Sequence, residues 1–243
     1  MDASIVRLDR YLVNKSLVES REKAKFLIES GKVTLNSQIA KKPSLKVKEG
    51  DTVEVKEGIK YVSRSGMKLE AALNEFNCDV KGFTCLDIGS STGGFTDCLL
   101  QKGALKVYAV DVGRDQLHKS LRSDERVISF EGSDIRGFSS SNIKEELDLI
   151  VIDVSFISIC EIIDVLKQFS SKKTRVIALI KPQFEVGKRF VKKGIVNDAD
   201  EAENALQRVR DAFKNEGFSI KGEIKSPLKG KEGNQEYLFY ANY

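Results

Sequence analysis

Four side chains able to take part in proton transfer stand beside apolar segments of the sequence. Asp153 follows the run LDLIVI and Lys181 follows VIALI, while Glu236 opens EYLFY and Lys68 lies within MKLEAAL. A charge at the end of a buried strand is costly unless it is paired or faces a cleft. Asp153 and Lys181 therefore mark a candidate catalytic centre, whereas Lys68 and Glu236, taken singly, are more typical of a solvated surface.

A glycine-rich turn, LDIGSSTGGF (86–95), follows the first apolar strand of the larger part of the chain. Glycines at this place let the backbone approach a nucleotide-like ligand. The spacing G-x-x-x-G-G departs from the dinucleotide pattern G-x-G-x-x-G, which disfavours a nicotinamide-linked enzyme. Asp111 closes the next strand, where it is placed to bind ribose hydroxyls, and Asp134 follows the third, where an adenine amino group can be held.

This combination favours a site for an adenosine ligand without a pyrophosphate, S-adenosylmethionine above all. The alternative interpretation, ordinary strand-to-helix turns with Asp caps and no ligand, is less favoured. The candidate cofactor-binding residues are Asp87, Gly89, Ser90, Thr92, Gly93, Gly94, Phe95, Asp111, Val112 and Asp134.

Other chemistries are poorly supported by the composition. A single His, His118, makes a zinc site or a His-based triad hard to build, so no metal is expected. Cys78, Cys85, Cys98 and Cys160 lack C-x-x-C spacing, and a chain with 31% charged residues does not suggest a disulfide scaffold. These thiols are expected to be reduced and mostly buried, and acid–base work must fall to Lys, Asp, Glu or Tyr.

Helices and apolar strands alternate after Ser63. We expect strands at 84–88, 106–111, 126–130, 147–153 and 174–180, helices at 64–76, 94–102, 114–122, 157–168 and 199–215, and terminal strands at 218–225 and 236–242. Short strands that are apolar on both faces predict a parallel sheet covered by helices on both sides. The last two strands have a short connection and must be antiparallel. The fold class is α/β, with a Rossmann-like, mostly parallel sheet.

The first quarter of the chain holds all the excess positive charge. Residues 1–62 carry 13 Lys and Arg against 9 Asp and Glu, a net charge of +4, and residues 63–243 carry 27 against 27. The pattern predicts two short helices, the second opened by Ser20 and ended by Gly31, followed by a small hairpin region. A basic module on a neutral body indicates a polyanionic partner, although a modest solvated charge excess is an equally good interpretation.

This first segment resembles an S4-type RNA-binding domain, a small α+β fold, through RLDRYL (7–12), SREKAKFLIESGKVTLN (20–36) and VKEGDTVEV (47–55). S4 domains hold RNA by shape and by phosphate contacts. The resemblance therefore implies RNA contacts from the cations of this segment, for each of which a merely solvated side chain is as good an explanation. They are Arg7, Arg10, Arg21, Lys25, Lys41 and Lys42.

Over nearly its whole length the chain resembles the hemolysin A/TlyA family, in which an S4 domain precedes a methyltransferase domain of the FtsJ (RrmJ) type. The resemblance is carried by VSRSGMKLEAAL (62–73), LDIGSSTGGFTDCLL (86–100), YAVDVGRDQL (108–117), DVSFISI (153–159), LIKPQFEVG (179–187) and EYLFY (236–240). It implies S-adenosylmethionine-dependent methylation of ribose 2′-hydroxyls in ribosomal RNA, with cytidine as the target base.

The FtsJ-type tetrad Lys-Asp-Lys-Glu corresponds, motif by motif, to Lys68, Asp153, Lys181 and Glu236. The implied domains are residues 1–58 for RNA binding and 63–243 for methyl transfer. Residues 59–62 form the interdomain segment, where Tyr61 replaces a family Trp.

Methylation of a ribose 2′-hydroxyl requires that a poor nucleophile lose its proton as it attacks. A Lys can accept that proton in its neutral form, which burial or a neighbouring cation favours, while carboxylates that hold its head favour the protonated form. We expect Lys181 to act as the base or to orient the hydroxyl, with Lys68 as the neighbouring cation. Alignment of the reacting atoms can supply roughly 7–11 kcal/mol of the rate enhancement.

Targeting and membrane segments are not evident in the 243 residues. No run approaches the roughly 20 apolar residues that span a bilayer, and MDASIVRLDR lacks the apolar core of a signal peptide. We therefore expect a cytoplasmic protein that works on ribosomal RNA or ribosomal subunits. The alternatives are a non-catalytic RNA-binding or ribosome-assembly factor, and a membrane-active, hemolysin-like protein.

Overall fold

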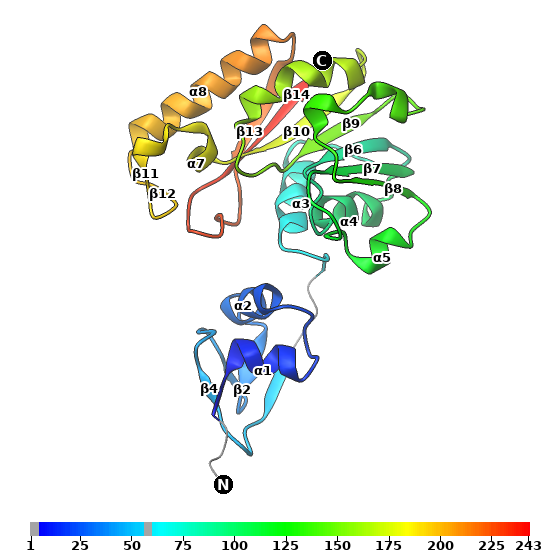
Figure 1. Cartoon of the computed structure of the whole chain (residues 1–243). Helices are drawn as coiled ribbons and strands as arrows, with labels where there is room; N and C mark the ends of the chain where they lie inside the picture. The colour runs from blue at the N-terminus through cyan, green and yellow to red at the C-terminus, as the bar shows by residue number, and fades with distance from the viewer. Residues whose placement is uncertain (1–4, 56–59) are drawn as a thin grey trace. The chain divides into compact units, whose positions relative to one another are not determined.

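The computed structural model describes residues 5–55 and 60–243. The chain divides into two units, residues 1–64 (unit 1) and residues 65–243 (unit 2), which are drawn in Figure 1. Of the expected interdomain segment 59–62, Ile59 lies outside the described residues, and Tyr61 is buried.

Unit 1 consists of two short helices beside two small antiparallel sheets. Its elements are β1 (Val6–Arg7), α1 (Leu8–Asn14), α2 (Arg21–Glu29), β2 (Val33–Leu35), β3 (Gln38–Ile39), β4 (Lys46–Val47) and β5 (Val53–Val55). β1 pairs with β4, and β2 lies between β3 and β5. Ser20 caps α2 by accepting a hydrogen bond from the Lys23 backbone N–H at 3.2 Å. The core of unit 1 is centred on Leu8, Leu12, Leu27 and Ile28.

Asp9 of α1 is a carboxylate with no exposed surface inside unit 1. Its Oδ1 accepts from Arg7 Nε at 2.9 Å and its Oδ2 from Arg21 Nη2 at 2.8 Å. Burial alone would raise the pKa of Asp9, but the two guanidinium hydrogen bonds outweigh it and bring the pKa to about 2. Asp9 thus joins the first turns of α1 and α2.

Unit 2 contains a seven-stranded sheet in the order β13-β14-β10-β9-β6-β7-β8. The parallel strands are β6 (Thr84–Ile88), β7 (Lys106–Asp111), β8 (Val127–Glu131), β9 (Leu149–Ile152) and β10 (Arg175–Ile180). β14 (Tyr237–Asn242) runs antiparallel to both β10 and β13 (Ser219–Lys225). The predicted α/β class with a mostly parallel sheet and an antiparallel C-terminal strand is confirmed.

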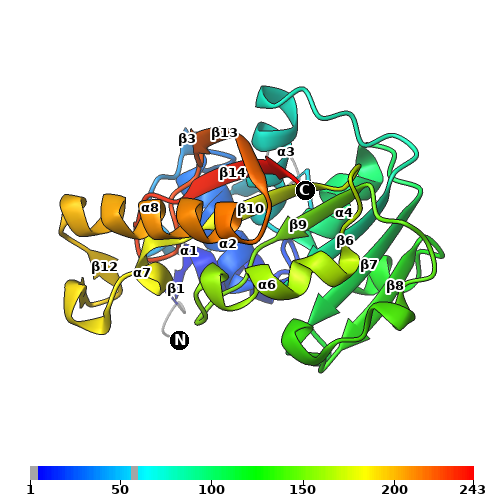
Figure 2. The ribbon, with the colours of Figure 1, turned by 90° about the horizontal axis from the view of Figure 1, so that it is seen from above.

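Helices cover both faces of this sheet, as Figure 2 shows with α6 and α8 on the face turned to the viewer. The helices are α3 (Ser65–Glu75), α4 (Gly94–Gln101), α5 (Lys119–Arg122), α6 (Ile163–Leu166), α7 (Pro182–Glu185) and α8 (Ala199–Asn215). Alternation along β6 sends Leu86 and Ile88 into the core that includes Leu206 and Phe213 of α8. Asp87, between them, meets Thr96 of α4 on the other face.

Two expected helices are shorter than predicted, and one hairpin was not predicted. The expected helix 114–122 is reduced to α5, because the residues before it form a loop held by hydrogen bonds described below. The expected helix 157–168 breaks at Ile162, whose φ of −125° is not helical, into a 3₁₀ turn (Ile159–Glu161), α6 and a second 3₁₀ turn (Lys167–Phe169). After a 3₁₀ turn at Lys188–Phe190, β11 (Val191–Lys192) and β12 (Ile195–Val196) form an additional hairpin.

Across residues 5–55 and 60–243, no helix is both long and apolar enough to cross a bilayer. The four cysteines are free; Cys78, Cys85 and Cys98 are buried, while Cys160 is exposed.

Asp9→Asn is expected to destabilise unit 1 at pH 7 by about 1–2 kcal/mol, because a pKa change of 1 is worth ~1.4 kcal/mol and the half-exposed arginines are screened. A carboxylate whose folded pKa lies below its ordinary 3.8 stabilises the fold above that value. The penalty should therefore disappear as the pH falls from about 4 to 2. Hydrogen exchange of unit 1 amides in the full chain measures it, with Glu49→Gln, an exposed carboxylate, as control. A pH-independent penalty would contradict the ionic account.

Candidate active site

Two lysine–carboxylate pairs lie at the carboxyl edge of the sheet in unit 2. The Lys181 Nζ is 2.7 Å from Asp153 Oδ1 and donates to the Ser155 Oγ at 2.8 Å. Lys68 Nζ donates to Glu236 Oε2, and these two side chains are only 6% and 3% exposed. The structure therefore pairs the four predicted residues two by two.

Strand register explains why the two pairs share one edge. Ile180 and Tyr237 are partners in the β10–β14 ladder, so Lys181, which follows Ile180, and Glu236, which precedes Tyr237, leave the sheet side by side. Asp153 follows β9, the other neighbour of β10. Lys68 comes from α3, outside the sheet, and its contact with Glu236 could not be predicted from strand periodicity.

Next to Asp153 is a cavity of about 500 Å³, within the range of small-molecule sites. Four of the predicted cofactor residues line it: Gly89, Asp111, Val112 and Asp134. The other six, Asp87, Ser90, Thr92, Gly93, Gly94 and Phe95, belong to the strand, turn and helix behind that wall and do not line it. Ser91, Gln116, Arg136 and Phe156 line the cavity and were not predicted.

Gly89 is the position where the turn needs a glycine. Its φ is +82°, and a Cβ there would lie 2.7 Å from the carbonyl oxygen of Asp153. The absence of a side chain lets the turn after β6 pass directly against the strand that carries Asp153. The same residue thus opens the cavity and brings its wall to the Lys181–Asp153 pair.

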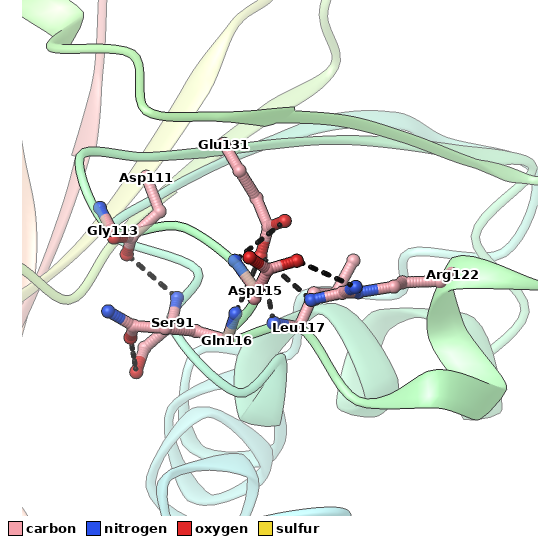
Figure 3. Close-up of polar contacts among 8 residues, drawn as sticks. All are labelled: Ser91, Asp111, Gly113, Asp115, Gln116, Leu117, Arg122 and Glu131. Carbon is pink, nitrogen blue, oxygen red and sulfur yellow. Dashed lines mark hydrogen bonds and ion pairs between the residues drawn. The ribbon is translucent and has the colours of Figure 1, made fainter.

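Asp111 holds two backbone segments together at the mouth of the cavity. Its Oδ2 accepts from the Ser91 N–H at 2.8 Å and its Oδ1 from the Gly113 N–H at 2.6 Å, and Ser91 Oγ donates to Gln116 Oε1 (Figure 3). Each carboxylate oxygen keeps a further acceptor site. Asp111 can therefore fix the loop and still accept hydrogen bonds from ligand hydroxyls.

Glu131, at the end of β8, shapes the rest of this loop. It accepts backbone hydrogen bonds from Asp115, Gln116 and Leu117 at 3.1, 2.8 and 3.0 Å, as Figure 3 shows. These bonds, that of Leu117 foremost, lower the pKa of Glu131. They hold residues 115–117 in a loop, which is why the predicted helix starts only at Lys119. The sequence carried no signal for this contact, because 15 residues separate Gln116 from Glu131.

Asp134 and Asp87 differ from the simple cofactor contacts that the sequence suggested. Asp134 Oδ2 accepts a hydrogen bond from Arg136 Nη2 at 2.6 Å, and this bond lowers the pKa of Asp134. Asp87 has no exposed surface and accepts from Thr96 Oγ1 at 2.6 Å. Burial raises the pKa of Asp87 to about 7 against the opposing Thr96 hydrogen bond. Asp87 thus supports the glycine turn from behind.

Phe156 is the most conspicuous side chain at the rim of the cavity. It is 92% exposed, its φ of +66° is rare for a residue with a side chain, and its ring centroid lies 5.2 Å from that of Phe184. Its neighbour Ser155 bonds Lys181. An apolar ring kept in water at such a place offers a flat face to a planar ligand.

Two of the six cations predicted in unit 1 contact Asp9. Arg7 and Arg21 bind its two oxygens, and the Asp9 N–H donates to the carbonyl of Pro43 at 3.1 Å, which brings the basic turn of Lys41 and Lys42 to the start of α1. Arg10 and Lys25 are exposed on their helices. In the part of the chain that the structure describes, no cluster of three or more His, Cys, Asp or Glu could hold a metal ion.

Comparisons with known proteins agree with this geometry. The family model for FtsJ-like methyltransferases matches residues 61–243, and that for the S4 domain matches residues 6–53. Hemolysin A of Brachyspira hyodysenteriae is 43% identical over 96% of this chain and 98% of its own length. The 23S rRNA (cytidine-2′-O)-methyltransferase TlyA of Campylobacter jejuni is 40% identical over 95% of this chain and 97% of its own. A solved structure from Streptococcus thermophilus that carries the hemolysin name matches with a TM-score of 0.78, 40% identity, and coverage of 98% of this chain and 88% of that one.

Gly89→Ala is expected to destabilise unit 2 by about 1–3 kcal/mol more than Gly82→Ala, because only the first adds overlap with the backbone. Gly82 is the matched control, since its φ is +77° but a Cβ there meets nothing within 4 Å. Thermal or urea unfolding of the full chain measures the difference. Equal losses in the two variants would mean that the close approach to Asp153 does not constrain the turn.

Proposed function

Because the chain belongs to the FtsJ-like methyltransferase family, and within it to the group of hemolysin A and TlyA, we propose that it methylates ribose 2′-hydroxyls of ribosomal RNA. The single observation that carries this proposal is the pairing of Lys181 with Asp153 and of Lys68 with Glu236 beside a cavity of nucleoside size. Cytidine is the proposed target base, as printed for the Campylobacter jejuni relative. Such a substrate implies work in the cytoplasm.

S-adenosylmethionine is the proposed methyl donor, and the cavity residues fit it. Asp111 presents acceptor sites for ribose hydroxyls, Asp134 can accept from an amino group, and Gly89 leaves room for close approach of the ligand to the backbone. The bound cofactor supplies a methyl group activated by a sulfonium. The backbone N–H groups of Ser91 and Gly113 keep Asp111 in place, and Gln116 holds Ser91 by accepting from its hydroxyl. Val112 offers an apolar surface of the cavity.

Lys181 is the proposed catalytic residue. Its Nζ donates a hydrogen bond to Ser155 and forms an ion pair with Asp153, which leaves the head of the side chain able to contact a substrate oxygen as well. As an ammonium, Lys181 would orient the 2′-oxygen for attack by donating a hydrogen bond to it. As a neutral amine, it would accept the hydroxyl proton with its lone pair while the oxygen–methyl bond forms and the methyl–sulfur bond of the donor breaks. Lys68 and Glu236 form the second wall of the centre and add one positive and one negative charge beside the first pair.

RNA contacts are proposed at two places. In unit 1, Arg7, Arg21 and the turn of Lys41 and Lys42 present cations to the phosphate backbone, with Arg10 and Lys25 on the helices beside them. In unit 2, Phe156 offers a stacking face for the base whose ribose reaches Lys181, since single-stranded RNA is commonly recognised by stacking on aromatic rings.

Asp111→Ala is expected to weaken S-adenosylmethionine binding by about 10- to 100-fold, because a hydrogen bond to a charged group is worth about 1.5–3 kcal/mol. Calorimetry on the full chain measures the affinity. Glu131→Ala is the control, since Glu131 holds the same loop but does not line the cavity. Equal losses in both variants would assign Asp111 to loop support alone.

Lys181→Met is expected to cut single-turnover methyl transfer by at least the 10²–10⁴-fold typical of general acid–base groups. Met keeps much of the stem but can neither accept a proton nor donate a strong hydrogen bond. Cofactor affinity should change little, and Lys172→Met, at the opposite end of β10, should react like the wild type. A rate near that of the wild type, with RNA and cofactor saturating, would remove Lys181 from the mechanism.

A further inference from the structure

The hairpin β11–β12 and the turn before it form a dense group of cations in unit 2, although residues 63–243 have no net charge by sequence. Within the segment GKRFVKKG (187–194), Lys188, Arg189, Lys192 and Lys193 are all exposed, and the segment contains no carboxylate. The net charge of residues 63–243 hides this group, because acidic residues elsewhere in the unit balance it.

A second basic segment lies against this hairpin. Residues 225–233, KSPLKGKEG, carry Lys225, Lys229 and Lys231 against the single carboxylate of Glu232. Gly194 of the hairpin approaches the side chain of Glu232, whose Cγ would be 3.0 Å from a Cβ at Gly194. The two segments together hold seven Lys and Arg and one Glu.

Asn234 fastens the two segments together, and it is only 5% exposed. Its Nδ2 donates to the carbonyl of Gly194 at 2.6 Å, and its Oδ1 accepts from the Val196 N–H at 2.9 Å. Its own carbonyl accepts from the Gly230 N–H at 2.8 Å. A buried amide with all these bonds fixes the relative position of the two loops, so the cations stand on a preformed support.

The same loop packs against the catalytic centre. A Cβ at Gly230 would lie 2.6 Å from Glu236 Oε1, the carboxylate that binds Lys68. On the other side, α7 connects Lys181 to the turn that precedes the hairpin. The basic group therefore belongs to the surroundings of the catalytic centre.

We propose that residues 187–196 and 225–234, here called the basic rim, bind the phosphate backbone of the RNA beside the nucleotide that is methylated. The inference rests on the proposed function for the identity of the polyanion. Phosphates spaced along a chain match a group of exposed Lys and Arg on two fixed loops, and such contacts position the nucleic acid without reading its sequence. A membrane surface is the poorer match, because Ile195 is the only large apolar side chain exposed on these two segments, both of which the structure describes in full.

Lys192→Gln/Lys193→Gln tests the basic rim in the full chain, with Lys172→Gln/Lys173→Gln as a matched control. The control removes the same two charges from exposed positions at the opposite end of β10. The probe is 16S and 23S rRNA transcript in filter binding between about 50 and 200 mM salt. The rim variant should bind about tenfold more weakly at the lower salt, and its log–log salt slope should be shallower by up to about 2, since each lost phosphate contact removes about 0.9. The control should bind like the wild type.

Lys225→Gln/Lys229→Gln removes two charges from the other segment and should give the same weakening, whereas cofactor affinity by calorimetry should stay unchanged in every variant. Wild-type RNA affinity in both rim variants, or a loss no larger than that of the control, would overturn the inference. So would the loss of binding to phosphatidylglycerol vesicles with RNA affinity intact, which would assign the rim to a membrane surface. If the wild type binds rRNA through the rim but transfers no methyl group, the proposed function fails while the rim remains.

Discussion

The placement of two lysine–carboxylate pairs at one edge of the sheet, one buried and one half-buried, is the constraint on which the rest of unit 2 depends. Lys68 and Glu236 are almost without solvent, and a buried ion left without its partner costs about 3–5 kcal/mol. The antiparallel pairing of β14 with β10 meets this requirement, because it places Glu236, just before β14, beside Lys181, just after β10. α3 lies close enough for Lys68 to reach Glu236. Gly230 fits the same requirement, because a side chain there would collide with Glu236.

The cavity beside these pairs is built by contacts between loops. Gly89 brings the turn after β6 against Asp153, Asp111 ties Ser91 to Gly113, and Glu131 holds residues 115–117. Backbone N–H groups that bond carboxylates are fixed before any ligand arrives, so less ordering is needed when one binds. Asp153 belongs both to the wall of the cavity and to the pair with Lys181, so in the proposed function it would couple the position of the methyl donor to that of the attacking oxygen.

Most strands could be predicted from the sequence, because parallel strands buried on both faces are uninterrupted apolar runs such as LIVI and VIALI. Their carboxyl ends also indicated Asp111, Asp153 and Lys181. The loops could not be predicted. A carboxylate at the end of β8 delays a helix until Lys119, and the break of 157–168 lies at the non-helical backbone of Ile162, a buried residue in an otherwise helix-like segment. Lys68 and Glu236 were indicated by the family resemblance, and only their mutual contact explains why both are buried. The sequence did not predict the exposure of Phe156, the contacts of Asn234 or the Arg7–Asp9–Arg21 cluster. Exposure and long-range hydrogen bonds leave no pattern in the local sequence.

The most direct test of the central claim is a map of alkali-resistant positions in ribosomal RNA from cells with the gene, without it, and with the gene encoding Glu236→Gln. A methylated ribose has lost the hydroxyl that attacks the neighbouring phosphate, so its linkage survives alkali. The account predicts resistant cytidines that are present only with the intact gene and lost or strongly reduced in the variant. Identical maps with and without the gene, or a gene-dependent methyl group carried on a base with an alkali-labile linkage, would contradict it.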